Sequence, residues 1–168
     1  MDIRKETKVN LKTKRIIYIS LIIINFIVIF MFSSQDSEES SKTSGVVVNR
    51  VVNTISNTNK KVKKEKLEDD VTFVVRKCAH FSIYTILGVL LSLFANTFNS
   101  QIKYKILGCL IVGFLYAISD EIHQSFVGGR SPEIRDVLID TCGVLCGVAI
   151  VNLKKILSIK NEKLKTEE

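Results

Sequence analysis

Charged residues are missing from four long stretches of this sequence, although charge is common in the rest of the chain. The stretches without charge are residues 16–32, 81–99, 106–119 and 141–153. Each is apolar all round rather than along one stripe, and a surface helix of a soluble bundle shows only a stripe. A helix needs about 20 apolar residues to cross the hydrocarbon core of a bilayer. The missing charge therefore argues against a soluble four-helix protein and favours four membrane spans.

Familiar catalytic and cysteine-based motifs are also missing. The sequence contains no P-loop, no nucleophile elbow and no metal motif, and no pair of its four cysteines has zinc-type spacing. The cysteines lie in or beside the apolar stretches, as small packing residues do. No small-x-small cleavage site follows the first apolar stretch, so we expect that helix to be retained. These absences leave the polar residues of the spans as the only indication of function.

The net charge of +7 is unevenly placed along the chain. Lysine and arginine are concentrated in residues 1–15, at positions 103 and 105, in residues 154–168, and in a cluster at residues 60–66. The last cluster belongs to a long loop, is balanced by neighbouring acids and argues against an outside position for that loop, but charge in long loops weighs less on topology. The other three regions carry the topology signal. In a chain with four spans these three regions lie on one side of the membrane, and the positive-inside rule makes that side the cytoplasm. The basicity therefore indicates topology, and we expect no nucleic-acid partner.

We predict an all-α membrane protein with four transmembrane helices and both termini in the cytoplasm. A basic N-terminus, residues 1–15, and a basic tail, residues 154–168, flank a membrane domain of residues 16–153. An extracytoplasmic loop, residues 33–70, separates the first two spans, and Asp69 or Asp70 can cap the second helix. The spans are expected at about residues 16–32, 71–98, 104–125 and 134–153.

The long loop contains one helical pattern. Its apolar residues fall on a single helical face, which is typical of an amphipathic helix lying on the outer membrane surface. The same pattern also fits the edge of a small ordered loop. The residues of this face are Val47, Val48, Val51, Val52 and Ile55.

Polar side chains gather where three of the predicted spans reach the outer leaflet. On the second helix, Arg76, His80 and Tyr84 form one stripe. Ionisable groups inside spans are expensive, face the bundle interior or a water-filled cavity, and mark functional sites. Alternatively, these groups pair cation to carboxylate and only fix the helix packing. The candidate binding residues are Arg76, Lys77, His80, Tyr84, Glu121, Gln124, Arg130, Asp136 and Asp140.

Two finer expectations concern the ends and faces of the helices. At the end of the third helix, Asp120, His123 and Gln124 are expected to share a face, while Glu121 points elsewhere. Small residues allow membrane helices to approach closely. The predicted packing residues of this kind are Gly88, Gly143 and Gly147.

The sequence resembles the VanZ-like family of bacterial membrane proteins over roughly residues 26–150. The resemblance is carried by Arg76-Lys77-Cys78-Ala79-His80-Phe81 with Tyr84 and Gly88, by Glu121-x-x-Gln124-x-Phe126, by Gly129-Arg130, by Asp136 and by Gly143-x-x-x-Gly147. Two residues depart from the family pattern: Gly128 stands where the family often has proline, and Asp140 stands where asparagine is common.

The resemblance implies a multi-pass protein of the bacterial cell membrane. It also implies a link to reduced susceptibility to teicoplanin, a lipid-anchored glycopeptide that binds peptidoglycan precursors. It supplies no settled reaction, cofactor or catalytic residue, so the mechanism has to be argued from the residues. The sequence carries no indication of oligomeric state.

The first candidate function is an outer-leaflet binding protein. Its ligand would be a lipid-linked peptidoglycan precursor, an anionic lipid or a lipoglycopeptide. Arg76, Lys77 and Arg130 suit a phosphate, since arginine makes bidentate contacts with that group. Asp136 and Asp140 would then orient the arginines.

The other candidates are an embedded enzyme and a transporter or structural scaffold. In a hydrolase or transferase acting on a lipid-linked substrate, His80 is the candidate base or nucleophile, with Asp120 or Glu121 as its partner. Four spans without internal repeats argue against a solitary transporter. A metal site at His80, His123 and nearby acids rests on two histidines from separate helices, which is weak support, so we predict no metal and no cofactor.

The predicted topology is testable by cysteine labelling in intact cells, in a background without the native cysteines. A Ser41→Cys variant should react with an impermeant maleimide added from outside, because residue 41 belongs to the extracytoplasmic loop. A Lys160→Cys variant should be labelled only after the cells are opened. The reverse pattern would invert the topology.

Overall fold

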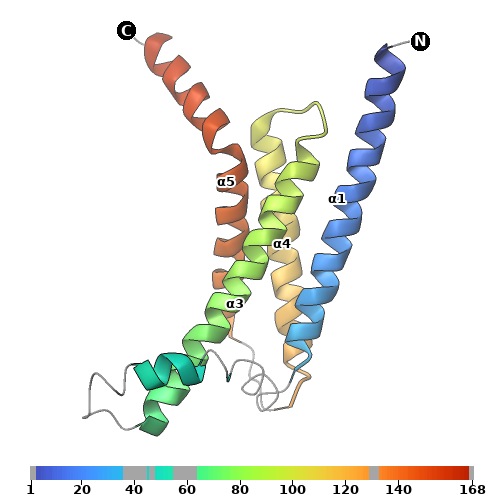
Figure 1. Ribbon diagram of the computed structural model, residues 1–168. Coiled ribbons are helices and arrows are strands. Elements are labelled where there is room, and N and C mark those ends of the chain that lie inside the picture. The colour runs from blue at the N-terminus through green and yellow to red at the C-terminus, as the bar shows by residue number, and fades with distance from the viewer. Residues whose placement is uncertain (1–2, 36–44, 46–47, 55–63, 129–132, 167–168) are drawn as a thin grey trace.

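The computed structural model describes residues 3–35, 45, 48–54, 64–128 and 133–166 of the chain. The described residues contain no strand, and most of them belong to long helices (Figure 1). The prediction of an all-α chain is therefore confirmed. The four long helices are α1 (Ile3–Ser33), α3 (Lys64–Ala95), α4 (Ile102–Gln124) and α5 (Ile134–Thr166).

Each of these helices contains a segment that is long and apolar enough to cross a membrane. Only 17% to 33% of the most apolar window in each segment is buried within the protein. Large apolar side chains such as Met31, Leu115 and Ile150 are instead more than half exposed. A soluble bundle would bury such side chains, whereas a membrane protein turns them towards lipid. The prediction of a multi-pass membrane protein is confirmed. The candidate spans are Asn10–Ser33, Lys66–Ala95, Ile102–Gln124 and Ile134–Leu153.

Three of the helices continue well beyond the uncharged stretches. α1 begins at Ile3, α5 continues to Thr166, and α3 begins at Lys64. Asp69 and Asp70 therefore lie inside α3, and the prediction that one of them caps the helix is wrong. The extensions are rich in lysine, glutamate and leucine, which are strong helix formers. The helix therefore continues where the apolar pattern stops.

A short helical segment is present in the predicted extracytoplasmic loop, at residues 48–54. Val48 and Val52 are 2% and 1% exposed, so this face of the segment packs on the protein rather than on lipid. Val51, which was expected on the same face, is exposed. Val47 and Ile55 lie outside the described residues.

The four long helices alternate in direction, so that α3 and α5 are parallel (Figure 1). The start of α1, the α3–α4 connection and the end of α5 lie at the upper end of the view. Arg15 ties two of these parts together: its guanidinium donates hydrogen bonds to the Thr97 hydroxyl at 3.1 Å and carbonyl at 2.9 Å. The guanidinium also lies 4.1 Å from the Phe98 ring centroid. This arrangement brings both chain ends to one side, and the assignment of that side to the cytoplasm stays a prediction.

The most extensive contact between helices is that of α3 with α5. At its centre the two backbones touch, because glycine removes the side chain that would separate them. A Cβ atom added to Gly147 would lie 2.1 Å from the Thr85 carbonyl oxygen, and one added to Gly88 would lie 2.2 Å from the Val144 carbonyl oxygen. At Gly143 the corresponding distance to an α3 carbonyl oxygen is 2.6 Å. No side chain larger than hydrogen fits these positions without a shift of the backbone.

The close contact at Gly88, Gly143 and Gly147 is called the small-residue seam below. Apolar and polar contacts between α3 and α5 continue it in both directions. Tyr84, Leu87 and Val144 are fully buried beside it. Nearer the end of α3, the buried amide of Asn152 donates hydrogen bonds to the Ser92 hydroxyl at 2.6 Å and to the Val148 carbonyl at 2.8 Å. The two helices are therefore held along most of the span.

Substitution of Gly147 tests this contact. Gly147→Ala should lower the thermal stability of the detergent-solubilised protein, because overpacking of a filled contact costs about 1–3 kcal/mol. Gly108→Ala on α4 is the matched control, because an added Cβ there meets no atom within 4 Å. The control should match or exceed the wild type, since alanine is the better helix former. Equal melting temperatures for the two variants in a size-exclusion stability assay would contradict the close approach.

Candidate functional site

A group of buried polar residues lies among α3, α4 and α5, towards the end where α4 is connected to α5. Asp120, Glu121, Gln124 and Asp140 are only 5%, 8%, 7% and 2% exposed. All four belong to the candidate membrane spans. Buried ionisable groups in a span require partners, so the partners of each group indicate what the site can still bind.

Lys77 on α3 contacts two carboxylates, one from Asp136 on α5 and one from Glu133, the residue just before α5. Its amine forms a hydrogen-bonded ion pair with the Asp136 carboxylate and lies 3.9 Å from a Glu133 carboxylate oxygen. The amine also lies 5.0 Å from the centroid of the Phe73 ring. Both side chains of the closer pair are about one fifth exposed, so the pair lies at the rim of the buried group. A phosphate would have to share Lys77 with these carboxylates.

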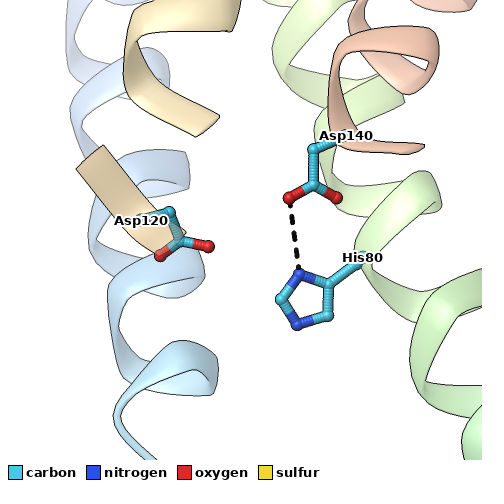
Figure 2. A group of neighbouring side chains, drawn as sticks. All are labelled: His80, Asp120 and Asp140. Atoms are coloured by element: carbon cyan, nitrogen blue, oxygen red, sulfur yellow. Dashed lines mark ion pairs between the residues drawn. The ribbon is translucent and has the colours of Figure 1, made fainter. Parts of the chain in front are cut away.

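His80, Asp120 and Asp140 converge from three different helices (Figure 2). Nδ1 of His80 lies 3.8 Å from a carboxylate oxygen of Asp140, an ion-pair distance if the ring is protonated. One ligating atom from each of the three residues lies within 4.8 Å of the others. The second oxygen of Asp140 is buried and has no hydrogen-bond partner among the described residues. This is the one group of three or more potential metal ligands that the described part of the chain contains.

Tyr84 lies one turn further along α3 than His80 and is fully buried. Its hydroxyl makes no hydrogen bond of standard length and angle in the part of the chain that the structure describes. The Asp120 carboxylate nevertheless lies near enough to interact with it directly, and Asp140 acts on it electrostatically. The phenol therefore borders the same cluster on the side of Asp120.

The end of α4 is rotated relative to the sequence-based expectation. Glu121 is buried and accepts the backbone N–H of Glu133, whereas His123 points towards α1. There, His123 stacks on Phe30 with ring centroids 4.4 Å apart and shares a hydrogen bond of 3.1 Å with the Ser34 hydroxyl. The prediction that His123 shares the face of Asp120 while Glu121 points away is wrong. The buried arc of α4 is centred between Glu121 and Gln124, and His123 lies at its edge.

Gln124 orients one of the buried acids. Its amide nitrogen donates to an Asp120 carboxylate oxygen at 3.1 Å and to the Ser33 hydroxyl at 3.3 Å. Gln124 thereby joins the end of α1 to the cluster. Its side chain is thus partly committed to the protein, although the sequence suggested a ligand-binding role.

Of the two arginines expected in the site, Arg76 belongs to the described residues and Arg130 does not. Arg76 is half-buried on α3, and its Nε is buried with no hydrogen-bond partner among residues 3–35, 45, 48–54, 64–128 and 133–166. That donor remains available within the described structure. Arg130 and the preceding Gly129 lie outside the described residues.

Three polar residues of the site were not singled out from the sequence. Glu133 contacts Lys77 and, through its backbone N–H, Glu121, while Ser33 and Ser34 contact Gln124 and His123. For Glu133 the available indication was its position between Pro132 and the start of the fourth apolar segment.

Comparison with known proteins gives one match. A family model described as VanZ/LLP1 matches residues 16–155, which include most of the first candidate span, the other three spans and every residue of the polar group. No curated protein and no solved structure matched the chain.

Proposed function

Because this chain belongs to the VanZ/LLP1 family, we propose that it binds a lipid-linked, anionic ligand of the bacterial cell envelope from the outer leaflet. Through this binding, it reduces susceptibility to teicoplanin-type glycopeptides. The candidate ligands are a lipid-linked peptidoglycan precursor, an anionic lipid and the lipoglycopeptide itself. They share an acidic group attached to a lipid chain, and a site inside a membrane span is reached by such molecules without leaving the bilayer.

The observation that carries this proposal is the unused donor of Arg76. A guanidinium binds phosphate or carboxylate through paired N–H groups, and a buried donor without a partner gains most from such a ligand. The amine of Lys77, the next residue, is paired with Asp136 and Glu133, and an anionic ligand would share it with these carboxylates. Arg130 completes the proposed set of cations from the connection between α4 and α5.

The proposal predicts a specific role for Arg76 in cells. Arg76→Met should restore teicoplanin susceptibility towards that of a vector control, because methionine keeps the apolar stem and removes every donor. Arg135→Met is the matched control, since Arg135 is 73% exposed and pairs only with Glu133 within the described structure. This control should keep the wild-type phenotype.

Susceptibility has to be compared at equal amounts of protein in the membrane. An Arg76→Met variant that retains full protection at wild-type abundance would refute the proposed binding role. Loss of protection in proportion to abundance would assign Arg76 to folding instead.

A second candidate function, a membrane-embedded hydrolase or transferase, is favoured by the pairing of His80 with Asp140. A carboxylate beside Nδ1 orients an imidazole and stabilises its protonated form, which is how many enzymes support a histidine base. Sequence reasoning suggested Asp120 or Glu121 as the partner. The structure gives Asp140 at 3.8 Å, with Asp120 close by.

Substitution of His80 by glutamine tests the catalytic alternative. Glutamine keeps hydrogen bonding but cannot accept a proton at neutral pH. If His80 is a base, His80→Gln and His80→Ala should lose protection equally at matched abundance. If His80 only donates a hydrogen bond, His80→Gln should retain clearly more protection than His80→Ala, and the enzymatic mechanism would then be excluded.

A further inference from the structure

We propose that His80, Asp120 and Asp140 form a binding site for one divalent metal ion, with Zn²⁺ or Mn²⁺ as the chemically suitable ions. The site lies between α3, α4 and α5, within the candidate membrane spans (Figure 2). It differs from the pair of histidines considered from the sequence, because His123 contacts α1 and takes no part in the cluster.

The donor set and its spacing suit such an ion. Imidazole nitrogen favours Zn²⁺ and related transition metals, and carboxylate oxygen is accepted by both Zn²⁺ and Mn²⁺. The ligating atoms of the three residues lie within 4.8 Å of one another, and the His80–Asp140 pair is separated by 3.8 Å. Ligands about 2.1 Å from a common ion lie roughly 3 to 3.5 Å apart. Small side-chain movements therefore bring the three donors to coordination distance.

An unpaired polar atom points independently to a missing partner. The second carboxylate oxygen of Asp140 is buried without a hydrogen-bond partner in the described structure, and the neighbouring Tyr84 hydroxyl, which lies near Asp120, makes no hydrogen bond of standard geometry there. Asp140 and Tyr84 are 2% and 0% exposed, so bulk water does not satisfy them. Nearly all buried polar atoms in proteins have a partner. An ion with one bound water satisfies both atoms, through coordination by Asp140 and a hydrogen bond to Tyr84.

The charge balance favours the same conclusion. Two buried carboxylates, Asp120 and Asp140, face a single imidazole, while the nearby amine of Lys77 is engaged by Asp136 and Glu133. Uncompensated negative charge inside a span is strongly unfavourable. A divalent cation would neutralise the cluster. Protonation of the carboxylates would also do so, and a measurement of bound metal distinguishes the two cases.

Side chains that bind a metal are commonly held in place by a hydrogen bond from a neighbouring residue, and Gln124 supplies such a bond to Asp120. It donates a hydrogen bond to one oxygen of Asp120 and is itself held near the Ser33 hydroxyl. Partners of this kind fix the orientation of a ligating carboxylate. The inference does not depend on the proposed function, because metal binding is measured in the absence of any lipid or glycopeptide.

The test uses the full-length protein without its cysteines, purified in detergent through a tag that contains no histidine. After treatment with a chelator, the protein is dialysed against Zn²⁺ or Mn²⁺, and bound metal is measured by elemental analysis. We expect saturation near one ion per chain and a higher melting temperature in the presence of the ion. His80→Ala and Asp140→Asn should bind the ion at least about 100-fold more weakly.

His123→Ala is the matched control, because it removes the only other histidine from a position outside the cluster. It should bind metal as the wild type does. Asp120→Asn, which preserves shape, supplies a second ligand variant if His80→Ala is misfolded, as judged by size exclusion. The proposal is overturned if the stripped wild type takes up no ion, or if folded His80→Ala, Asp140→Asn or Asp120→Asn binds with wild-type affinity. The first result would assign the cluster to shared protons.

Discussion

The close contact of α3 and α5 is the constraint on which the polar site depends. Glycine at positions 88, 143 and 147 lets the two backbones touch, and touching backbones fix the register of two parallel helices. With that register set, Lys77 lies opposite Asp136, His80 opposite Asp140, and Ser92 opposite Asn152. Because both helices rise equally per residue, one contact determines all the others. The polar pairs are thus a consequence of a small-residue seam.

Beside the α3–α5 contact, buried polar groups lie at two levels, and the levels differ in how completely their groups are paired. Near the end of α3, Asn152 is satisfied by Ser92 and Val148. In the cluster of His80, Asp120 and Asp140, hydrogen-bonding capacity remains unused on one oxygen of Asp140 within the described structure. A fully paired network serves helix packing, whereas unpaired buried groups are costly unless something else binds them. The difference separates a polar contact that serves helix packing from one that retains capacity to bind a further group.

The four spans could be predicted from the sequence because a helix surrounded by lipid carries few charged side chains. The ends of the helices did not, because lysine and glutamate continue α3 and α5 beyond the apolar segments by propensity alone. The buried polar residues of the three site helices were also accessible, but Glu133, Ser33 and Ser34 were missed, and so was the partner of each group. Whether Glu121 or His123 faces the interior depends on a modest rotation of α4, set by packing against α1 through Phe30 and Ser34. No periodicity in one sequence encodes that rotation.

The lengths of α3 and α5 have a mechanical consequence. They contain 32 and 33 residues and are therefore each about 50 Å long, while the apolar core of a bilayer is about 30 Å thick. Being parallel but offset, they extend beyond their uncharged stretches at opposite ends: α3 at the end where residues 48–54 lie, and α5 at the end of the chain termini (Figure 1). Because the contact at Gly88, Gly143 and Gly147 leaves no room for sliding, we expect the membrane segments of the two helices to move as one unit.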